Sequence, residues 1–200
     1  MSRLGYFGGT FDPPHIGHQI LAAEGMYQLE LDLLYWILTP LPPHKLKRKI
    51  SDVRLREEMV QAMIQSMTGW KLSPVDLDRD PPYYAADTME IIRRQNPDEH
   101  ISYLIGEDSL RDLSTWYDVS RFLSKIDCLA VLERPGIETD VEKLAETLPG
   151  IQGKLRFLTA PEIQISSSEI RRRVKSGIPF KHFLSPNVYR YLKTNEIYSS

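Results

Sequence analysis

The fold is decided by the stretch GGTFDPPHIGH, residues 8–18. Before it, Leu4, Tyr6 and Phe7 make a short apolar run that is typical of a strand, and after it apolar residues recur at helical spacing. The glycines therefore lie where a strand of a sheet passes into a helix. This is the position at which α/β sheets bind phosphates, so the stretch predicts both a fold class and a kind of ligand.

The same stretch contains the groups that an anion site needs. Gly8 and Gly9 let backbone N–H groups approach a ligand without a Cβ atom in the way, and the following helix N-terminus adds unpaired donors. His15 and His18 are three residues apart, so both imidazoles can donate to oxygens of one polyphosphate. Two simpler interpretations stay open: a tight turn followed by surface histidines, or a metal site that includes Asp12.

Apolar strand-like runs alternate with amphipathic helical stretches along the rest of the chain. After the first strand, we expect strands at residues 33–39, 72–75, 101–105, 128–132 and 155–158. We expect helices at residues 16–29, 52–67, 85–95, 109–122 and 141–148. This alternation predicts an α/β fold with a Rossmann-like, doubly wound, mostly parallel sheet. Residues 165–200 depart from it and predict a small C-terminal helical part, with helices at residues 167–175 and 186–193.

Length and composition fit one main domain. The chain has 200 residues, with 25 basic and 27 acidic side chains and a formal net charge of −2. Nucleic-acid surfaces usually carry a basic excess, so this balance argues against one. The single Cys128 excludes an intrachain disulfide and a Cys-rich zinc site, and its apolar neighbours predict a small buried residue in a strand. A reducing cytoplasm fits best, because the sequence shows neither an export signal nor an apolar run of about 18 residues.

A second group of candidates is the segment LPPHK, residues 41–45, followed by the basic run KRK at residues 47–49. It follows the second predicted strand, so it lies at the carboxyl edge of the sheet and places cations beside the phosphate site. A basic run on a loop is usually a solvated surface, and that interpretation stays open for residues 47–49. Lys45 differs from them because two prolines restrict its approach.

A third group is the segment ISSSEIR, residues 165–171, in which three hydroxyl groups precede a helix. Arg171 lies about one turn into that helix, on the same side as Ser168. Hydroxyls, N-terminal amides and a guanidinium together form a second anion cradle. A helix N-cap is the simpler interpretation, and one segment can serve both purposes. Two cradles on opposite sides of one switch point suit a triphosphate held along its length.

These motifs resemble those of the nucleotidyltransferase superfamily of α/β phosphodiesterase-like folds. Residues 9–18 match its GTFDPxHxGH signature at every fixed position, and residues 165–171 look like its ISxTxIR motif with serine at the threonine position. The segment PPHK, residues 42–45, resembles a signature of one branch, the nicotinate mononucleotide adenylyltransferases. The sequence has no Walker A, GxGxxG or GxSxG pattern, which disfavours P-loop hydrolysis, ordinary hydride transfer and a Ser-His-Asp hydrolase.

The middle of the chain resembles the same branch. The segment PPYYAADT, residues 81–88, is similar to the branch's PSYTxxTL-like segment, with two departures. Residues 105–110 with Trp116 resemble its IGxDSLxxLxxW segment, which implies that the indole stacks on a pyridine ring; standing alone, Trp116 would be a core residue. The segment ERPG, residues 133–136, matches an xRPG element and places Arg134 near the nucleotide, although an ion pair with a neighbouring acid is the simpler interpretation.

The resemblance implies adenylyl transfer by a single nucleotidyltransferase domain, residues 1–200. The 5′-phosphate of nicotinate mononucleotide attacks the α-phosphorus of ATP in line, pyrophosphate leaves, and deamido-NAD is made, with Mg²⁺ on the phosphate oxygens and no protein ligand assigned to the metal. The implied catalytic residues are His15, His18, Lys45 and Arg171. The implied ATP contacts are Gly8, Gly9, Thr10, Phe11, His15, His18, Gly106, Asp108, Ile165, Ser166, Ser168 and Arg171. The implied mononucleotide contacts are Thr10, Lys45, Tyr84, Thr88, Asp108, Trp116, Tyr117 and Arg134.

Two other classes of function stay open. A sister adenylyltransferase for nicotinamide mononucleotide or phosphopantetheine, or a cytidylyltransferase, would share both anion cradles; the last two should lack the PPHK and Trp116 segments. A non-catalytic nucleotide-binding regulatory module should lack the catalytic histidines. The expected partners are ATP and nicotinate mononucleotide, with neither nucleic acid nor membrane, and a homo-oligomer stays open.

Overall fold

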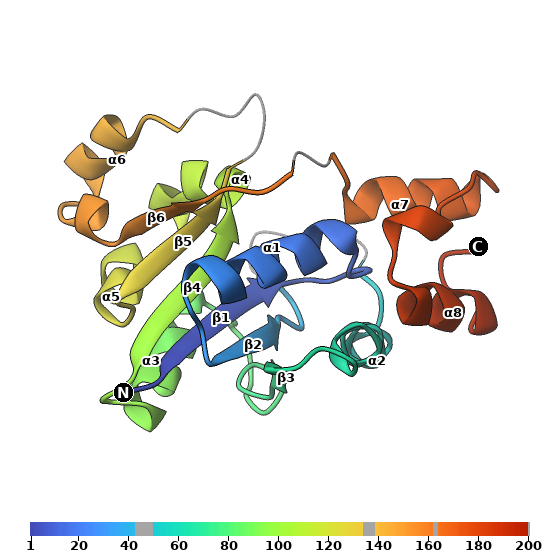
Figure 1. The fold of residues 1–200 in the computed structure, drawn as a ribbon, viewed down its shortest axis with the longest axis horizontal. Helices are drawn as coiled ribbons and strands as arrows, with labels where there is room; N and C mark the ends of the chain where they lie inside the picture. Colours follow the sequence, from blue (N-terminus) through green and yellow to red (C-terminus); the bar gives the residue numbers. More distant parts are fainter. Residues whose placement is uncertain (43–49, 134–138, 162–163, 200) are drawn as a thin grey trace.

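A six-stranded sheet forms the centre of the molecule, and all of its neighbouring strands run parallel (Figure 1). The strand order is β3-β2-β1-β4-β5-β6. The strands are β1 (Arg3–Gly9), β2 (Leu33–Leu38), β3 (Trp70–Ser73), β4 (His100–Gly106), β5 (Cys128–Leu132) and β6 (Leu155–Leu158). The chain builds outward from β1 to β3 and then returns to the other side of β1, so the topological switch point lies between β1 and β4. This order confirms the predicted doubly wound α/β fold.

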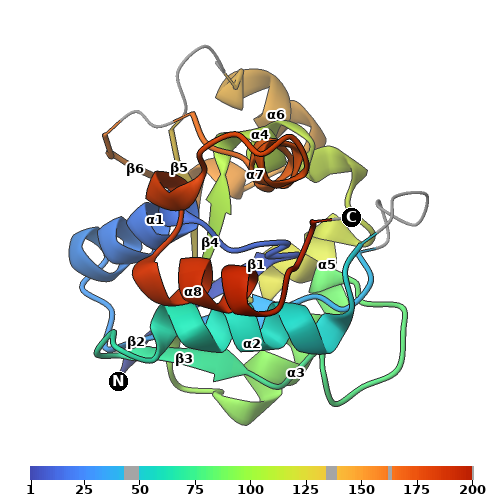
Figure 2. The same cartoon turned by 90° about the vertical axis from the view of Figure 1, so that its right-hand side faces the viewer.

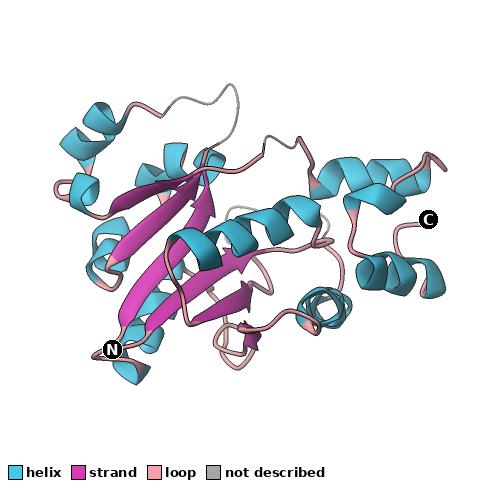
Figure 3. Cartoon of the chain, viewed as in Figure 1, coloured by secondary structure: helices cyan, strands magenta, loops and turns pink. Residues whose placement is uncertain are grey.

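Helices cover both faces of this sheet (Figure 3). The computed structural model describes residues 1–42, 50–133, 139–161 and 164–199. The helices are α1 (Ile16–Gln28), α2 (Val53–Ile64), α3 (Ala85–Gln95), α4 (Glu107–Arg111), α5 (Val119–Ser124), α6 (Val141–Thr147), α7 (Ser167–Lys175) and α8 (Pro186–Thr194). Within the described ranges, none of the helices has both the length and the apolar character that crossing a membrane requires.

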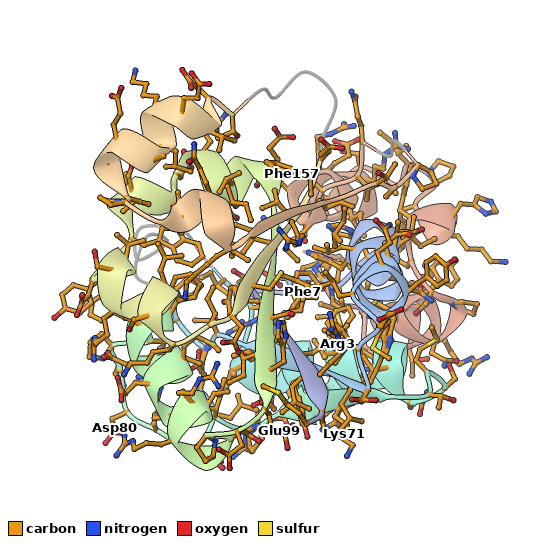
Figure 4. The ribbon with its side chains drawn as sticks, turned by 60° about the vertical axis from the view of Figure 1, so that its left-hand side comes forward. Arg3, Phe7, Lys71, Asp80, Glu99 and Phe157 are labelled. Carbon is orange, nitrogen blue, oxygen red and sulfur yellow. The ribbon has the colours of Figure 1, made fainter. Side chains whose placement is uncertain are left out.

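Two apolar clusters fill the space between the sheet and its helices. On one face Phe7 packs with residues of α1, α2, α7 and α8, and Figure 4 labels Phe7 in the interior of the molecule. On the other face Leu4 and Tyr6 pack with residues of α3, α4, α5 and α6. Successive side chains of a strand point to opposite faces, so the alternation along β1 assigns each helix layer its own half of the core.

Most predicted elements are confirmed, and one prediction is wrong. The strands β5 and β6 have the predicted bounds, and Cys128 is buried in β5 as expected. The single helix predicted over residues 109–122 is instead divided into α4, a 3-10 turn at Leu113–Thr115, and α5. Trp116 has an extended backbone and Asp118 has a φ of 47°, a left-handed conformation that Asp tolerates. Asp118 then caps α5 by accepting from the Arg121 N–H, so the helix restarts there.

The C-terminal helical part packs beside the N-terminal half of the fold. In Figure 2, α8 lies alongside α2, and the Tyr191 hydroxyl donates to a Glu58 carboxylate oxygen at 2.6 Å. Ser185 caps α8 and Pro186 occupies its first turn, as the sequence predicts. Ile170 of α7 and Val188 of α8 are fully buried in the same apolar cluster as Phe7. These contacts hold α7 at the carboxyl edge of the sheet.

Arg56 of α2 binds the backbone of the two loops that follow β1 and β2 at the carboxyl edge of the sheet. Its side chain is only 1% exposed and donates four hydrogen bonds to backbone carbonyls. They reach Ser51 at 2.9 Å, Thr10 and Thr39 at 3.0 Å, and Pro40 at 2.6 Å. Burial lowers the pKa of this guanidinium, and the nearby Asp12 carboxylate opposes that shift. The loops after β1 and β2 are therefore held at a fixed separation.

We predict that Arg56→Lys lowers the free energy of unfolding by about 2–4 kcal/mol, because a lysine ammonium keeps the charge but cannot serve all four carbonyls. Denaturant titration measures this loss. Arg54→Lys on the exposed side of the same helix is the control and should stay within about 0.5 kcal/mol of the parent. Equal stability of the two variants would contradict the role given to Arg56.

Candidate functional site

The predicted site segments lie at one edge of the sheet. Because the sheet is parallel, its carboxyl ends face the same way, and residues 8–11 end β1 or follow it. Tyr84 and Thr88 come after β3, Gly106 ends β4, and the segment 164–171 comes after β6. This edge at a switch point is where open α/β sheets bind ligands. Lys45 and Arg134, and residues 47–49, lie outside the described residues.

The loop after β1 is closely packed. Phe11 has a φ of 48° and is buried. A Cβ atom on Gly9 would lie only 2.7 Å from the Phe11 ring. A Cβ atom on Gly8 would lie 2.2 Å from the Tyr103 hydroxyl. Both glycines are therefore required by neighbouring side chains, a reason that the sequence pattern does not reveal. The tight fit fixes the backbone that leads into α1.

His15 and His18 are brought together at the start of α1. Their rings stack with centroids 3.7 Å apart and an angle of 27° between the ring planes. The His15 backbone N–H donates to His18 Nδ1 at 3.1 Å, so the His18 Nδ1 atom is an acceptor and its ring proton belongs on Nε2. Phe7 and Phe11 contact the His18 ring from the core side. This arrangement gives His18 one defined donor atom, Nε2.

The alternative metal site is not formed by these residues. The Asp12 carboxylate accepts from the Tyr198 hydroxyl at 2.6 Å and from the Ser51 N–H at 3.3 Å, and its side chain is nearly buried. Among residues 1–42, 50–133, 139–161 and 164–199, no group of three His, Cys, Asp or Glu side chains could hold a metal ion. Asp12 instead shapes the turn before α1 through these hydrogen bonds.

The second anion cradle touches the first one directly. Ser166 caps α7 by accepting from the Glu169 N–H, and the Ser167 hydroxyl donates to the Pro13 carbonyl at 2.9 Å. Arg171 Nη1 donates to the Asp12 carbonyl at 2.5 Å, while Nη2 lies 3.3 Å from the Ser168 hydroxyl. The second cradle, at the start of α7, therefore contacts the loop of the first, and because α1 and α7 pack in the same apolar cluster, the predicted placement of the two cradles on opposite sides of the switch point is wrong. Side by side, they concentrate N–H and O–H donors for one anion.

Thr88 belongs to a buried polar network behind this edge. Its hydroxyl donates to Asp76 at 2.8 Å and accepts from Arg79 at 3.0 Å, and Arg79 also pairs with Asp76 at 3.0 Å. Burial raises the pKa of the Asp76 carboxyl, while the Thr88 hydrogen bond and the Arg79 charge oppose the shift. This network fixes the start of α3 next to β2 and β3.

Aromatic rings gather beside the start of α3. The rings of Tyr84 and Tyr117 stack with centroids 4.2 Å apart, and Tyr117 is 56% exposed. Trp116 is half-buried, and its indole lies against Phe122 at 5.4 Å and edge-on to Tyr103 at 6.5 Å. Trp116 is thus anchored in the core on one side. Flat electron-rich rings with part of their surface exposed suit a planar heterocycle.

The segment after β4 supplies backbone groups at the switch point. Gly106 precedes α4, whose first turn holds Glu107 and Asp108. The buried Glu107 carboxylate accepts from the Thr139 N–H at 3.3 Å, which ties α4 to the start of α6. Asp108 is half-buried in the same turn. The predicted residues Gly106 and Asp108 therefore lie on the edge that also carries the loop after β1.

Three residues at this edge are not among those predicted from the sequence. Arg56 shares the buried face of α2 with Met59, Val60 and Met63. A charged residue on an apolar face of a predicted helix could have indicated its structural role from the sequence. Asp76 gave no such signal although its partners Arg79 and Thr88 are close in sequence, and Tyr198 gave none because its partner Asp12 is 186 residues away.

The chain is similar to known proteins over most or all of its length. A model of the cytidylyltransferase-like family matches residues 6–173. Nicotinate-nucleotide adenylyltransferase of Bacillus subtilis is 34% identical over 200 residues, and the match covers all of both chains. A Thermomicrobium roseum protein named probable nicotinate-nucleotide adenylyltransferase is 37% identical over 198 residues, which cover 99% of this chain and 92% of that protein.

Solved structures show the same fold. The nicotinic acid mononucleotide adenylyltransferase of Plasmodium falciparum, complexed with APC and with NaAD, superposes with a TM-score of 0.79 at 16% identity. These matches cover 99% of this chain and 98% of that protein. The sequence relatives extend over the full length of the chain and share one name. The chain therefore belongs to the cytidylyltransferase-like family and, within it, to the nicotinate-nucleotide adenylyltransferases.

Proposed function

We propose that this protein transfers AMP from ATP to nicotinate mononucleotide, giving nicotinate adenine dinucleotide and pyrophosphate. One observation carries the proposal: the His15 and His18 pair and the Ser168 and Arg171 pair meet at one loop of the switch point. Together they offer imidazole, hydroxyl and guanidinium donors to one polyphosphate. The full-length relatives named for this activity support the same assignment.

The reaction requires alignment and charge neutralisation more than a protein nucleophile. The mononucleotide 5′-phosphate is already an anion, and it attacks the α-phosphorus as the bond to pyrophosphate breaks. We assign His18 Nε2, His15 and Arg171 to the ATP phosphates, and on the family resemblance alone we add Lys45 to them. Donors fixed before the substrate binds stabilise the charge that develops on the leaving group. No covalent enzyme intermediate is needed.

Nucleotidyltransferases of this family generally use a divalent metal with ATP. We propose Mg²⁺, which usually keeps several waters and binds through substrate phosphates and one or two carboxylates rather than an all-protein cage. The site fits this mode, since imidazole and guanidinium donors can hold the phosphates without a three-ligand cluster in the described ranges. When bound, the metal neutralises phosphate charge.

We assign the acceptor, nicotinate mononucleotide, to the part of the carboxyl edge that carries the rings of Tyr84, Trp116 and Tyr117. We propose that Trp116 stacks on the pyridine ring and that Tyr84 and Tyr117 border it. We also assign to the acceptor Thr88, near the start of α3, and Asp108, in the first turn of α4. We also assign Thr10, in the loop after β1, to the acceptor, and on the family resemblance alone we add Arg134.

We further propose that the enzyme acts as one domain in the cytoplasm on these two small molecules, without nucleic acid or membrane. The formal net charge of −2 supports the absence of a nucleic-acid surface. The acceptor alternatives are nicotinamide mononucleotide and phosphopantetheine. A non-catalytic nucleotide-binding module is the alternative from another class.

Pyrophosphate release tests the assignment. We expect release from ATP and Mg²⁺ with nicotinate mononucleotide at a kcat/KM at least tenfold above that with nicotinamide mononucleotide or phosphopantetheine, since even small differences in substrate contacts change kcat/KM by about tenfold or more. A preference for either other acceptor would overturn the substrate. No release with any of them would favour the binding module.

His18→Ala should lower kcat by about 10²–10³, because one positioned donor to the developing charge contributes that much. Single-turnover AMP transfer measures it, and circular dichroism confirms that the variant is folded. His182→Ala, an exposed histidine near α8, is the control with parental kcat. If His18→Ala kept near-normal kcat, His18 would have no catalytic role.

Trp116→Ala should raise the KM for nicotinate mononucleotide about tenfold, which corresponds to the loss of roughly 1.4 kcal/mol of stacking. The KM for ATP should not change. Trp116→Phe keeps a flat ring and should recover much of the acceptor affinity, which separates stacking from the packing against Phe122. An unchanged acceptor KM in Trp116→Ala would remove Trp116 from the site.

A further inference from the structure

The last residues of the chain reach the first motif. After α8 the chain turns back toward α7 (Figures 1 and 2). Ile197 is buried in the apolar cluster that also holds Phe7, and Tyr198 follows it with a φ of 66°. The Tyr198 hydroxyl donates to Asp12 Oδ1 at 2.6 Å across a separation of 186 residues. A tyrosine rarely adopts a left-handed conformation, so the buried Ile197 and the hydrogen bond to Asp12 together account for its backbone.

Asp12 is held by donors from three segments of the chain. Tyr198 binds one carboxylate oxygen, and the Ser51 N–H binds the other at 3.3 Å. Arg171 Nη1 binds the backbone carbonyl of Asp12 at 2.5 Å, and the same Nη1 lies 3.8 Å from Oδ2. Arg56, under the same loop, adds a second positive charge near this carboxylate. The Arg171 guanidinium is thus close to the carboxylate without a short hydrogen bond to it.

This geometry creates a competition for Arg171. A carboxylate is a strong, bidentate partner for a guanidinium, as is a phosphate. If the Tyr198 hydroxyl were removed, Asp12 Oδ1 would lose its donor and the carboxylate could rotate toward Arg171, whose Nη1 already lies 3.8 Å from Oδ2. An ATP phosphate would then have to displace that carboxylate. Burial and the Asp12 charge raise the pKa of the Tyr198 phenol, so it stays a neutral donor.

We propose that Tyr198 is a positioning residue for ATP: its hydroxyl holds the Asp12 carboxylate away from Arg171, so that the Arg171 guanidinium remains available to the triphosphate. This inference rests on the proposed function, because it takes Arg171 as a phosphate ligand. It assigns the chain end a part in substrate binding that lies outside both anion motifs.

Binding of a non-hydrolysable ATP analogue, with a methylene group between the α- and β-phosphorus, tests the proposal by calorimetry. Tyr198→Phe should raise the Kd about tenfold, because the Asp12 carboxylate then competes with the phosphate for one charge-assisted hydrogen bond. The KM for ATP should rise similarly, with the acceptor KM unchanged. Tyr191→Phe is the matched control, since it also removes a hydroxyl that donates to a carboxylate at 2.6 Å near the chain end. Its Kd should equal that of the parent.

Asp12→Asn in the Tyr198→Phe background separates competition from simple loosening of the chain end. A neutral amide cannot form the ion pair with Arg171, so the double variant should return to within about threefold of the parental Kd. A double variant that binds as weakly as Tyr198→Phe, or worse, would overturn the proposal. So would an unchanged Kd in Tyr198→Phe. A parent protein that binds no ATP analogue would instead contradict the proposed function, and thermal unfolding of every variant verifies that each is folded.

Discussion

Four hydrogen bonds from one buried guanidinium hold the loops on which the carboxyl edge depends. Backbone carbonyls that follow parallel strands have no further strand to pair with, and buried carbonyls need donors. Several backbone N–H groups that could bind these carbonyls are missing, because prolines follow both β1 and β2 in the sequence. The planar guanidinium of Arg56 serves both loops at once. The separation of the two loops is therefore set before any ligand binds, which is what a preorganised anion site requires.

A carboxylate beside a phosphate site presents a second constraint. Asp12 is 3% exposed, and a buried charge is tolerated only when it is paired and hydrogen-bonded. Its donors come from the loop before α2, from α7 and from the chain end. The same bonds that stabilise Asp12 join the N-terminal motif to the helices that follow β6. Those helices follow the last strand of the sheet, and they form part of the edge at which the site lies.

Local patterns predicted the fold well where local forces decide it. The bounds of β5 and β6 follow from short apolar runs between polar residues, and the start of α8 follows from Ser185 and Pro186. The prediction of one helix across residues 109–122 was wrong. Apolar residues keep helical spacing through Trp116, but the backbone leaves the helical conformation there and at Asp118. Contiguous motifs likewise led to the residues that we propose as phosphate donors around α1 and α7. The sequence did not predict roles for Arg56 and Tyr198. Their hydrogen-bond partners lie in other segments of the chain, so these roles are visible only in the folded structure.

The two faces of the sheet divide the proposed site between the two substrates. His15, His18 and Arg171 come from helices that pack on the Phe7 side, whereas Trp116 and the helix that carries Thr88 pack with the opposite apolar cluster. In-line displacement needs the attacking phosphate and the leaving pyrophosphate on opposite sides of the α-phosphorus. With the proposed polyphosphate donors on one side of the edge and the aromatic rings of the proposed acceptor site on the other, the doubly wound topology would supply that opposition. Under this proposal the α-phosphorus would lie at the switch point between β1 and β4, where the two sides meet.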